Sequence, residues 1–250
     1  MRVFHLLYAV VAYMVFLAVF LYLIAFVGNI PPAPLTVDHG PDSPVAAAVA
    51  IDLALIALFG FQHSVMARPA FKAGWLRFVP PPIERSTYVL ATSVVLILLF
   101  LGWQPLTAPV WSVGNPTAAT VLWGLFGLGW LIVLVSTFLI SHFELFGLRQ
   151  VWLAWRGRPD TPPMLREPLF YRLVRHPLYA GFFIALWATP QMSVGHLLLT
   201  TGLSLYMFVA IRLEERNLVD VFGDAYRAYR ARTPMLVPGL GGAGGERDAR

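Results

Sequence analysis

The chain has 250 residues, of which 58% are hydrophobic and only 12% are charged. Soluble domains usually carry roughly 25% charged residues, so this composition excludes an ordinary water-soluble domain and is typical of a protein with several membrane-spanning helices. The net charge of +5 lies in a few loops and forms no Lys/Arg-rich stripe, so we expect no nucleic-acid partner. The absence of Cys excludes disulfides, thiolate metal sites and a Cys nucleophile, and no metal site is expected.

Four long apolar segments come first along the chain, each near the roughly 20 residues that a membrane-spanning helix requires. They are residues 3–27, 45–66, 87–103 and 117–140. The first is too long for the apolar part of a signal peptide, and no A-x-A cleavage site follows it. We therefore interpret it as an uncleaved helix.

A fifth apolar region is interrupted at Pro190. Residues 178–189 are short for a span and residues 194–211 continue beyond the proline, which predicts a helix-turn-helix hairpin with its turn at 190–193. After Arg212, apolar residues recur at helical spacing opposite charged ones, which predicts an amphipathic helix on the cytoplasmic side.

The expected fold class is all-α. It is a polytopic membrane helical bundle with four long transmembrane helices, a C-terminal helix-turn-helix hairpin and a cytoplasmic amphipathic helix. We expect residues 1–238 to form one membrane-embedded domain, and the Gly-rich residues 239–250 to form a disordered tail.

The distribution of basic residues predicts an orientation. The loops at 28–44, 104–116 and 190–193 contain no Lys or Arg, and all 18 basic residues lie at the other helix ends. Cytoplasmic loops carry the excess of Lys and Arg, so both termini are expected in the cytoplasm of a bacterial inner-membrane protein. Trp103 and Trp111 are expected to mark the opposite membrane interface as an aromatic belt.

The segment from Arg175 to Gly181 combines an Arg-His pair with a helix-starting proline next to an apolar stretch. Farther along the chain, Arg212 and the doubled glutamate Glu214-Glu215 lie at the end of another apolar helix. Ionisable groups are costly near lipid, so these residues are candidates for a functional site. The alternative interpretation is that the basic residues only anchor the chain and the glutamates lie on a solvated face.

Together with Phe222-Gly223, Tyr226 and Tyr229, these residues resemble the signature of one family. It comprises the integral-membrane S-adenosylmethionine-dependent methyltransferases that include isoprenylcysteine carboxyl methyltransferase. The resemblance implies a cytoplasmic S-adenosylmethionine pocket without a Rossmann domain, in a cofactor region of about 141–235. It assigns cofactor binding to Arg175, His176, Tyr179, Gly181, Arg212, Glu214 and Glu215. It further implies that Tyr226 and Tyr229 close the pocket.

The chemistry of these residues suits that cofactor. Glu214 and Glu215 offer acceptors for its amine and ribose hydroxyls. Arg175, His176 or Arg212 offers a donor for its carboxylate, together with the free N–H groups of a helix that starts at Pro177. Gly181 is expected to let the backbone or the cofactor approach closely on that helix.

The N-terminal half narrows the resemblance. Segments 61–68, 84–88 and 141–151 are similar to bacterial proteins once grouped with nitrite-reductase-associated membrane proteins, and more closely to the methanethiol S-methyltransferases. This resemblance implies methyl transfer to the sulfur of a small thiol, with methanethiol as the expected substrate and dimethyl sulfide as the product.

Polar residues at the cytoplasmic ends of the second to fourth helices are expected to converge. They are His63, Glu84, Arg85, Tyr88, His142, Glu144, Arg149 and Gln150. By position we expect catalytic roles for His142, Glu144, Tyr88 and Arg85, with His142 on the thiol side, and a cofactor contact for Gln150. The alternative is that each histidine is an interfacial hydrogen-bonding residue. No residue is identified as the general base.

Two rival functions remain open at this point. A prenylcysteine carboxyl or phospholipid methyltransferase needs a lateral opening to the bilayer, which a sequence does not reveal. A non-enzymatic membrane redox or haem subunit would use His63, His142 and His176 as ligands. However, all three lie at cytoplasmic helix ends, without the facing mid-membrane pairs of a helical haem protein.

Overall fold

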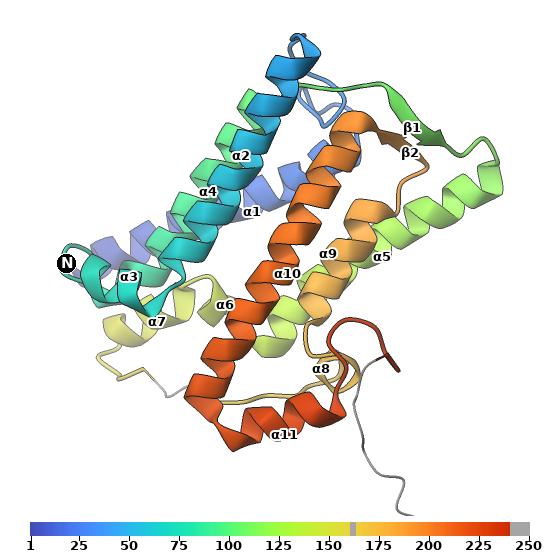
Figure 1. The fold of residues 1–250 in the computed structure, drawn as a ribbon. Helices are drawn as coiled ribbons and strands as arrows, with labels where there is room; N and C mark the ends of the chain where they lie inside the picture. The colour runs from blue at the N-terminus through green and yellow to red at the C-terminus, as the bar shows by residue number, and fades with distance from the viewer. Residues whose placement is uncertain (161–163, 241–250) are drawn as a thin grey trace, which may run out of the picture.

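The computed structural model, which describes residues 1–160 and 164–240, is an all-α bundle and confirms the expected fold class (Figure 1). Five helices are long and apolar enough to cross a membrane: α1 (Arg2–Val27), α2 (Val45–Met66), α4 (Glu84–Gly102, after the 3₁₀ turn η1, Pro81–Ile83), α5 (Pro116–Ile140) and α10 (Val194–Phe222). The shorter helices are α3 (Pro69–Trp75), α6 (His142–Leu145), α7 (Leu148–Trp155), α8 (Phe170–Leu173), α9 (Pro177–Trp187) and α11 (Asp224–Arg232). Residues 241–250 of the expected tail lie outside the described residues.

Local sequence signals start two of the long helices. Asn115 caps α5, where its side chain accepts a hydrogen bond from the backbone N–H of Ala118 at 3.0 Å, and Pro116 occupies the first turn. Ser193 caps α10 in the same way through the N–H of His196, also at 3.0 Å. A side-chain oxygen at this position satisfies one of the N–H groups that a helix start leaves unpaired.

Helix α9 is too short to cross a bilayer. Its 11 residues reach about 17 Å at about 1.5 Å per residue, against a hydrocarbon core of about 30 Å. It packs against α5 and is followed at its outer end by a short return to α10 (Figure 1). The start of α9 is thereby held at the level where α5 ends.

The outer connection differs from the expected simple turn. Residues Gln191–Ser193 form strand β2, which pairs antiparallel with β1 (Pro109–Ser112) (Figure 1). The segment 104–116 supplies this pairing partner, and no local signal near Pro190 reveals it. The pair joins the outer ends of α5 and α10.

Buried polar contacts close the same end of the molecule. Trp103, expected in an aromatic belt, is instead a core residue with 1% exposure, and its indole N–H donates to the Val37 carbonyl at 3.0 Å. Trp111 donates to the Thr189 carbonyl at 3.1 Å. Asp52 is fully buried and accepts a hydrogen bond from the N–H of Gln104 at 2.9 Å. These contacts fasten the outer loops to the bundle.

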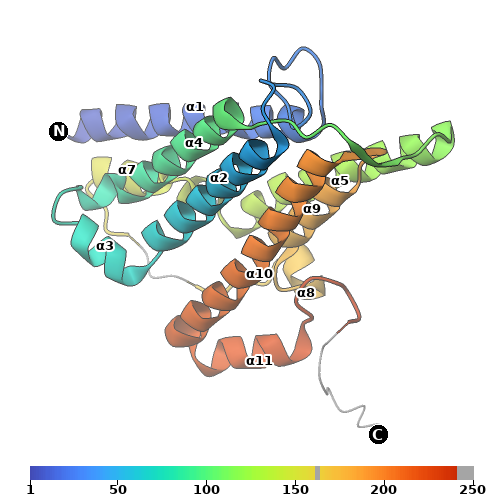
Figure 2. The ribbon, with the colours of Figure 1, turned by 45° about the horizontal axis from the view of Figure 1, so that its top comes forward.

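The C-terminal helices also divide differently from the expectation. Helix α10 runs without interruption through Arg212 to Phe222, and the break comes at Gly223, whose φ of +56° is in a region that favours glycine. Helix α11 then crosses beneath the inner ends of α8 and α10 (Figures 1 and 2). The stripe expected to form one amphipathic helix is thus split between the last turns of α10 and the whole of α11.

Candidate active site

The start of α9 is built by the Arg-His-Pro segment. Pro177 occupies the first turn, and His176 is the residue before it. The backbone N–H groups of Arg175 and His176 donate to the carbonyls of Pro234 and Met235, at 2.8 and 3.1 Å. The chain that leaves α11 therefore returns to hold this corner.

Glu215 is the centre of a buried ionic cluster. Its Oε1 accepts from Nε of Arg175 at 2.7 Å and lies 3.1 Å from Nε2 of His176. The side chains of Arg175, His176 and Glu215 are 9%, 4% and 13% exposed. Arg175 also donates to the Thr233 carbonyl at 2.5 Å, so the cluster ties α9, α10 and the end of α11 together.

Glu214 has a different environment. Its side chain is 46% exposed, and Oε2 accepts a hydrogen bond from the Tyr179 hydroxyl at 3.1 Å. The carboxylate lies within electrostatic range of four further phenols: Tyr88, Tyr171, Tyr206 and Tyr226. In the described part of the chain, the exposed side chain of Arg212 makes no hydrogen bond or ion pair. Glu214 and Arg212 are therefore the charged groups of the motif that are available to a ligand.

The two tyrosines of α11 line the underside of this region. Tyr226 is 1% exposed, and its hydroxyl has no hydrogen-bond partner among the described residues. Tyr229 donates to the Tyr171 carbonyl at 2.6 Å, and burial raises its pKa to about 12, so it stays a hydrogen-bond donor at neutral pH. Tyr229 therefore fixes α11 to α8, whereas Tyr226 keeps a free polar group. Pocket closure by these two residues stays a prediction.

Gly181 makes its close approach to α5. A Cβ atom at this position would lie 2.7 Å from the Gly129 carbonyl oxygen and 2.9 Å from the Val133 nitrogen. Of the two expected close approaches to Gly181, by a backbone or by the cofactor, the structure has the backbone of a neighbouring helix. We assign a packing role to Gly181; a direct contact with a cofactor has no support from this geometry.

His63, Tyr88 and Arg85 form a second group, between α2 and α4. The Tyr88 hydroxyl lies 2.9 Å from Nε2 of His63, and the Arg85 guanidinium lies over the Tyr88 ring at 5.2 Å from its centroid. Arg85 also donates to the Leu145 carbonyl at 2.8 Å, which links α4 to α6. The ring of Tyr206 of α10 lies 6.3 Å from the His63 ring, and Glu214 of the same helix lies within electrostatic range of Tyr88.

His142 lies in a third group, apart from the ionic cluster. Its ring nitrogens lie 2.8 Å from the Tyr13 hydroxyl and 2.8 Å from Oγ1 of Thr137, and its ring stacks on Phe138 at 4.1 Å. Burial lowers its pKa, and no charged group contributes to that shift. Both nitrogens are thus occupied by neutral protein groups. These contacts match the alternative of a hydrogen-bonding residue, and the thiol-side role of His142 stays a prediction.

The remaining expected residues lie near α6 and α7 and only partly converge. Glu144 pairs with Arg149 at 3.2 Å, and its backbone carbonyl accepts from the Gln150 amide at 3.0 Å. Oε1 of Gln150 is buried without a partner among the described residues. Glu84 instead faces Lys72 of α3 at 3.8 Å. A catalytic role for Glu144 and a cofactor contact for Gln150 stay predictions.

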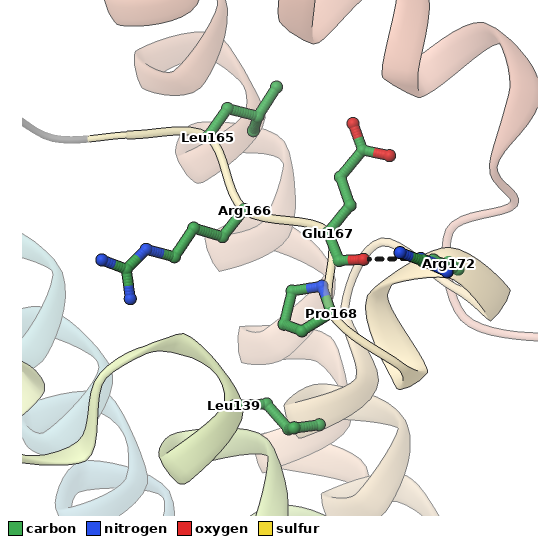
Figure 3. A pocket seen from close by; sticks show the side chains of 6 residues that line it. All are labelled: Leu139, Leu165, Arg166, Glu167, Pro168 and Arg172. Carbon is green, nitrogen blue, oxygen red and sulfur yellow. Dashed lines mark hydrogen bonds between the residues drawn. The ribbon is translucent and has the colours of Figure 1, made fainter.

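A pocket of about 570 Å³ opens beside the inner end of α5 (Figure 3). Its lining residues are Leu139, Leu165, Arg166, Glu167, Pro168 and Arg172. Glu167 joins this loop to α11 through Arg232, at 2.6 Å. No motif in the sequence predicts this pocket. Tyr206 was also missed, although a phenol inside an apolar span is a recognisable signal.

Comparison with known proteins places these features in a family. A methanethiol S-methyltransferase from Mycobacterium tuberculosis is 52% identical over 237 residues, which cover 95% of this chain and 97% of that protein. Methanethiol S-methyltransferase 1 from Bradyrhizobium diazoefficiens is 51% identical, covering 93% of this chain and 81% of its own length. The chain belongs to the methanethiol S-methyltransferase family.

Membership of the methanethiol S-methyltransferase family confirms the expected resemblance. Nurim from Sus scrofa is a more distant relative, 31% identical over 189 residues, or 71% of this chain and 70% of Nurim. No family model and no solved structure matches the chain. The protein is thus an integral-membrane methyltransferase, and its reaction requires a methyl donor.

Proposed function

We propose that this protein transfers a methyl group from S-adenosylmethionine to the sulfur of methanethiol, giving dimethyl sulfide. The similarity to methanethiol S-methyltransferases across 95% of the chain carries this proposal. The separation of Glu214 and Arg212 from the buried Arg175–Glu215 pair supports it, because it leaves two opposite charges available to a ligand.

The residues present fit S-adenosylmethionine. Glu214 has one carboxylate oxygen bonded to Tyr179 and the other available for an amine or a ribose hydroxyl. Arg212 offers a guanidinium for the carboxylate of the amino acid group. The hydroxyls of Tyr171 and Tyr226, which have no partner in the described part of the chain, supply further buried donors. When bound, S-adenosylmethionine supplies a methyl group activated by a sulfonium cation.

Charge considerations suit a site enclosed by helices. A thiolate and a sulfonium are consumed to give two neutral thioethers, so charge disappears toward the transition state and a low-dielectric site can favour the reaction. The helix ends contribute by holding the two reactants in line. A simple alkyl thiol is mostly protonated at neutral pH, so a residue of the chain must accept its proton.

The location of the site follows from the basic helix ends. We place the start of α9, the inner end of α10 and both termini on the cytoplasmic side of a bacterial inner membrane, where S-adenosylmethionine is made. Residues 1–238 act as one domain, with the cofactor contacts concentrated in about 141–235.

The test is formation of dimethyl sulfide in the headspace over detergent-solubilised protein given S-adenosylmethionine and methanethiol. Glu214→Gln should weaken cofactor binding about 10- to 100-fold while the fold is retained, since hydrogen bonds to charged groups contribute about 1.5–3 kcal/mol. Glu215→Gln should also lower the unfolding temperature, because it leaves Arg175 buried without its counter-charge.

Two outcomes would contradict the proposal. Cofactor binding without dimethyl sulfide would transfer the activity to another acceptor, such as a prenylcysteine carboxylate or a phospholipid. A protein that binds no S-adenosylmethionine by calorimetry would remove the cofactor assignment itself.

A further inference from the structure

His63 and Tyr88 form a hydrogen-bonded pair at the boundary of the Glu214 region. The Tyr88 hydroxyl lies 2.9 Å from Nε2 and 3.0 Å from Nδ1 of His63, and the two rings are 5.1 Å apart. Tyr88 is 7% exposed, and the imidazole stacks on Phe59. The proposed function assigns no role to His63.

A third side chain contacts one ring nitrogen of His63. Oγ1 of Thr92 lies 3.2 Å from Nδ1 of His63. If the ring proton is on Nδ1 it is donated to Thr92, and Nε2 is then the acceptor for the Tyr88 hydroxyl. This arrangement presents a basic nitrogen to the phenol, in the way that a base is oriented by a further partner in an acid-base relay.

Helix α10, which carries Glu214, contacts the pair through Tyr206, whose ring lies 6.3 Å from the His63 ring. Tyr88 lies within electrostatic range of Glu214 and of Tyr179, the two residues joined by a hydrogen bond at the start of α9. The Arg85 guanidinium over the Tyr88 ring supplies a cation that stabilises negative charge developing beside the hydroxyl. His142 instead makes its hydrogen bonds to Tyr13 of α1 and Thr137 of α5, and no charged group contributes to its pKa shift.

We propose that Tyr88 and His63 form the proton relay that ionises the thiol, with Tyr88 in contact with the thiol and His63 accepting the proton through it. This inference rests on the proposed function. The thiol S–H bond breaks and its electron pair stays on sulfur. The proton passes to the Tyr88 oxygen while the phenolic proton passes to Nε2 of His63. The sulfur then forms a bond to the methyl carbon. The bond between this carbon and the methyl donor breaks, and its electron pair stays with the donor.

The total charge is conserved in this step. One positive charge leaves the donor as its sulfonium becomes a thioether, and one positive charge appears on the His63 imidazolium, which later releases its proton to water. Titratable and charged groups act on the relay from the surrounding elements: Arg85 and Glu84 of α4, and Tyr206 and Glu214 of α10.

The experiment compares His63→Gln and Tyr88→Phe with two matched controls. His39→Gln removes an exposed histidine from an outer loop, and Tyr8→Phe removes a phenol that donates to another threonine of α4, Thr87, at 3.1 Å. Each variant is assayed with methanethiol and with 2,2,2-trifluoroethanethiol, a small thiol of greater acidity. Calorimetry with S-adenosylmethionine and a thermal unfolding curve report on cofactor binding and on the fold.

The relay predicts that both variants lose about 10²- to 10⁴-fold in turnover of methanethiol, the usual contribution of general acid-base catalysis. The loss should be much smaller with trifluoroethanethiol, and cofactor affinity should stay unchanged. Turnover of methanethiol by His63→Gln should rise about tenfold per pH unit below the thiol pKa, as the thiolate fraction does. The control variants should behave as the unaltered protein.

Nitrogen NMR of histidine-labelled protein gives a readout that does not depend on turnover. The His63 signal, identified by its loss in His63→Gln, should show the proton on Nδ1. An equal loss with both thiols, or a proton on Nε2, would overturn the relay. Failure of the unaltered protein to methylate either thiol would instead contradict the proposed function.

Discussion

Glu214 and Glu215 are adjacent in the chain, but their two carboxylates lie in different environments. Successive helical positions point about 100° apart, so one side chain turns toward Arg175 and His176 while the other turns toward Tyr179. The buried member must be paired because an isolated buried charge is costly. The exposed member keeps an oxygen for a ligand. A doubled glutamate thereby supplies one structural and one binding residue.

The same distinction applies to the histidines. Each ring has one tyrosine and one threonine as hydrogen-bond partners: Tyr13 and Thr137 for His142, and Tyr88 and Thr92 for His63. The His63 ring also contacts α10 through Tyr206. Both residues are found at inner helix ends, and sequence position alone treats them alike. Their partners come from α1 and α4, which are distant in sequence, so only the packing of the bundle separates the two roles.

We expect His142→Phe to remove a pH-dependent cost of folding without abolishing methyl transfer. Burial lowers the pKa of His142 below its ordinary value of 6.5, so the unfolded chain binds a proton there that the folded protein does not. Stability therefore falls as the pH decreases below about 6.5, and the variant should lose less stability between pH 7 and pH 5. At pH 7 the variant should be less stable by about 1–3 kcal/mol, because the Tyr13 hydroxyl loses its partner.

The measurement is chemical unfolding in detergent at the two pH values, with His39→Gln as the control for an exposed histidine. Turnover of methanethiol per folded molecule should be retained. A large loss of turnover in a folded His142→Phe protein would restore this residue to the thiol site.

At the scale of the elements, α5 and α9 are joined through two glycines. A Cβ at Gly129 would lie 2.5 Å from the nitrogen of Ala185, and one at Gly181 would lie 2.7 Å from the Gly129 carbonyl. Small residues allow helix backbones in membranes to approach closely, where dispersion and weak contacts replace the hydrophobic effect. The contact matters for the site because α9 begins at His176 and is too short to be held by the bilayer alone.

We expect Gly181→Ala to destabilise the protein by about 1–3 kcal/mol, the usual cost of overpacking, and to weaken S-adenosylmethionine binding by displacing the start of α9. Gly127→Ala is the matched control. It lies on α5, and its added Cβ meets no atom within 4 Å, so it should be neutral or slightly stabilising. Thermal unfolding and calorimetry of the two variants make the comparison. Equal behaviour of both would contradict the close contact between α5 and α9.

Apolar length predicted the spans well, and their boundaries were less predictable. The four N-terminal helices and the divided fifth region are confirmed, because about 20 apolar residues have few alternatives in a membrane protein. The break at Gly223 was misplaced to Arg212, since charged residues at a helix end do not interrupt its hydrogen bonds. The pairing of β1 with β2 joins segments about eighty residues apart and leaves no local pattern.

The candidate site was only partly predictable, because packing between segments that are distant in the chain leaves no local pattern. The Arg-His-Pro and Glu-Glu motifs predicted the ionic cluster, because these motifs resemble the signature of a known family. The motif did not show that Gly181 faces α5, nor that Glu215 is the buried partner. These properties depend on how α9, α5 and α10 cross, and crossing geometry is set by packing along their whole lengths.

At the scale of the whole molecule, chemistry is separated along the membrane normal. Among the described residues, the helix ends on the side of α3, α7 and α11 carry the Lys and Arg side chains, and the opposite end is closed by β1, β2 and the loop at 28–44 without a basic residue. The outer closure contains Asp38, which bonds to Asn29 and Ser193 and so ties the loop to the start of α10. The candidate site, by contrast, is assembled from helix ends and the returning α11 (Figure 2). One side thus fixes the bundle, and the other is free to bind substrates.

This polarity predicts the accessibility of single cysteines, and the natural absence of Cys makes the measurement direct. Ser112→Cys lies on exposed β1 and Ala228→Cys on the exposed face of α11. In intact spheroplasts of a bacterial host, a membrane-impermeant maleimide should label Ser112→Cys, and it should label Ala228→Cys only after the membrane is opened. Labelling of both variants in denatured, full-length protein controls for thiol reactivity. The reverse pattern would place the site outside the cell, away from the S-adenosylmethionine pool, and the basic helix ends would then oppose the usual retention of Lys and Arg in the cytoplasm.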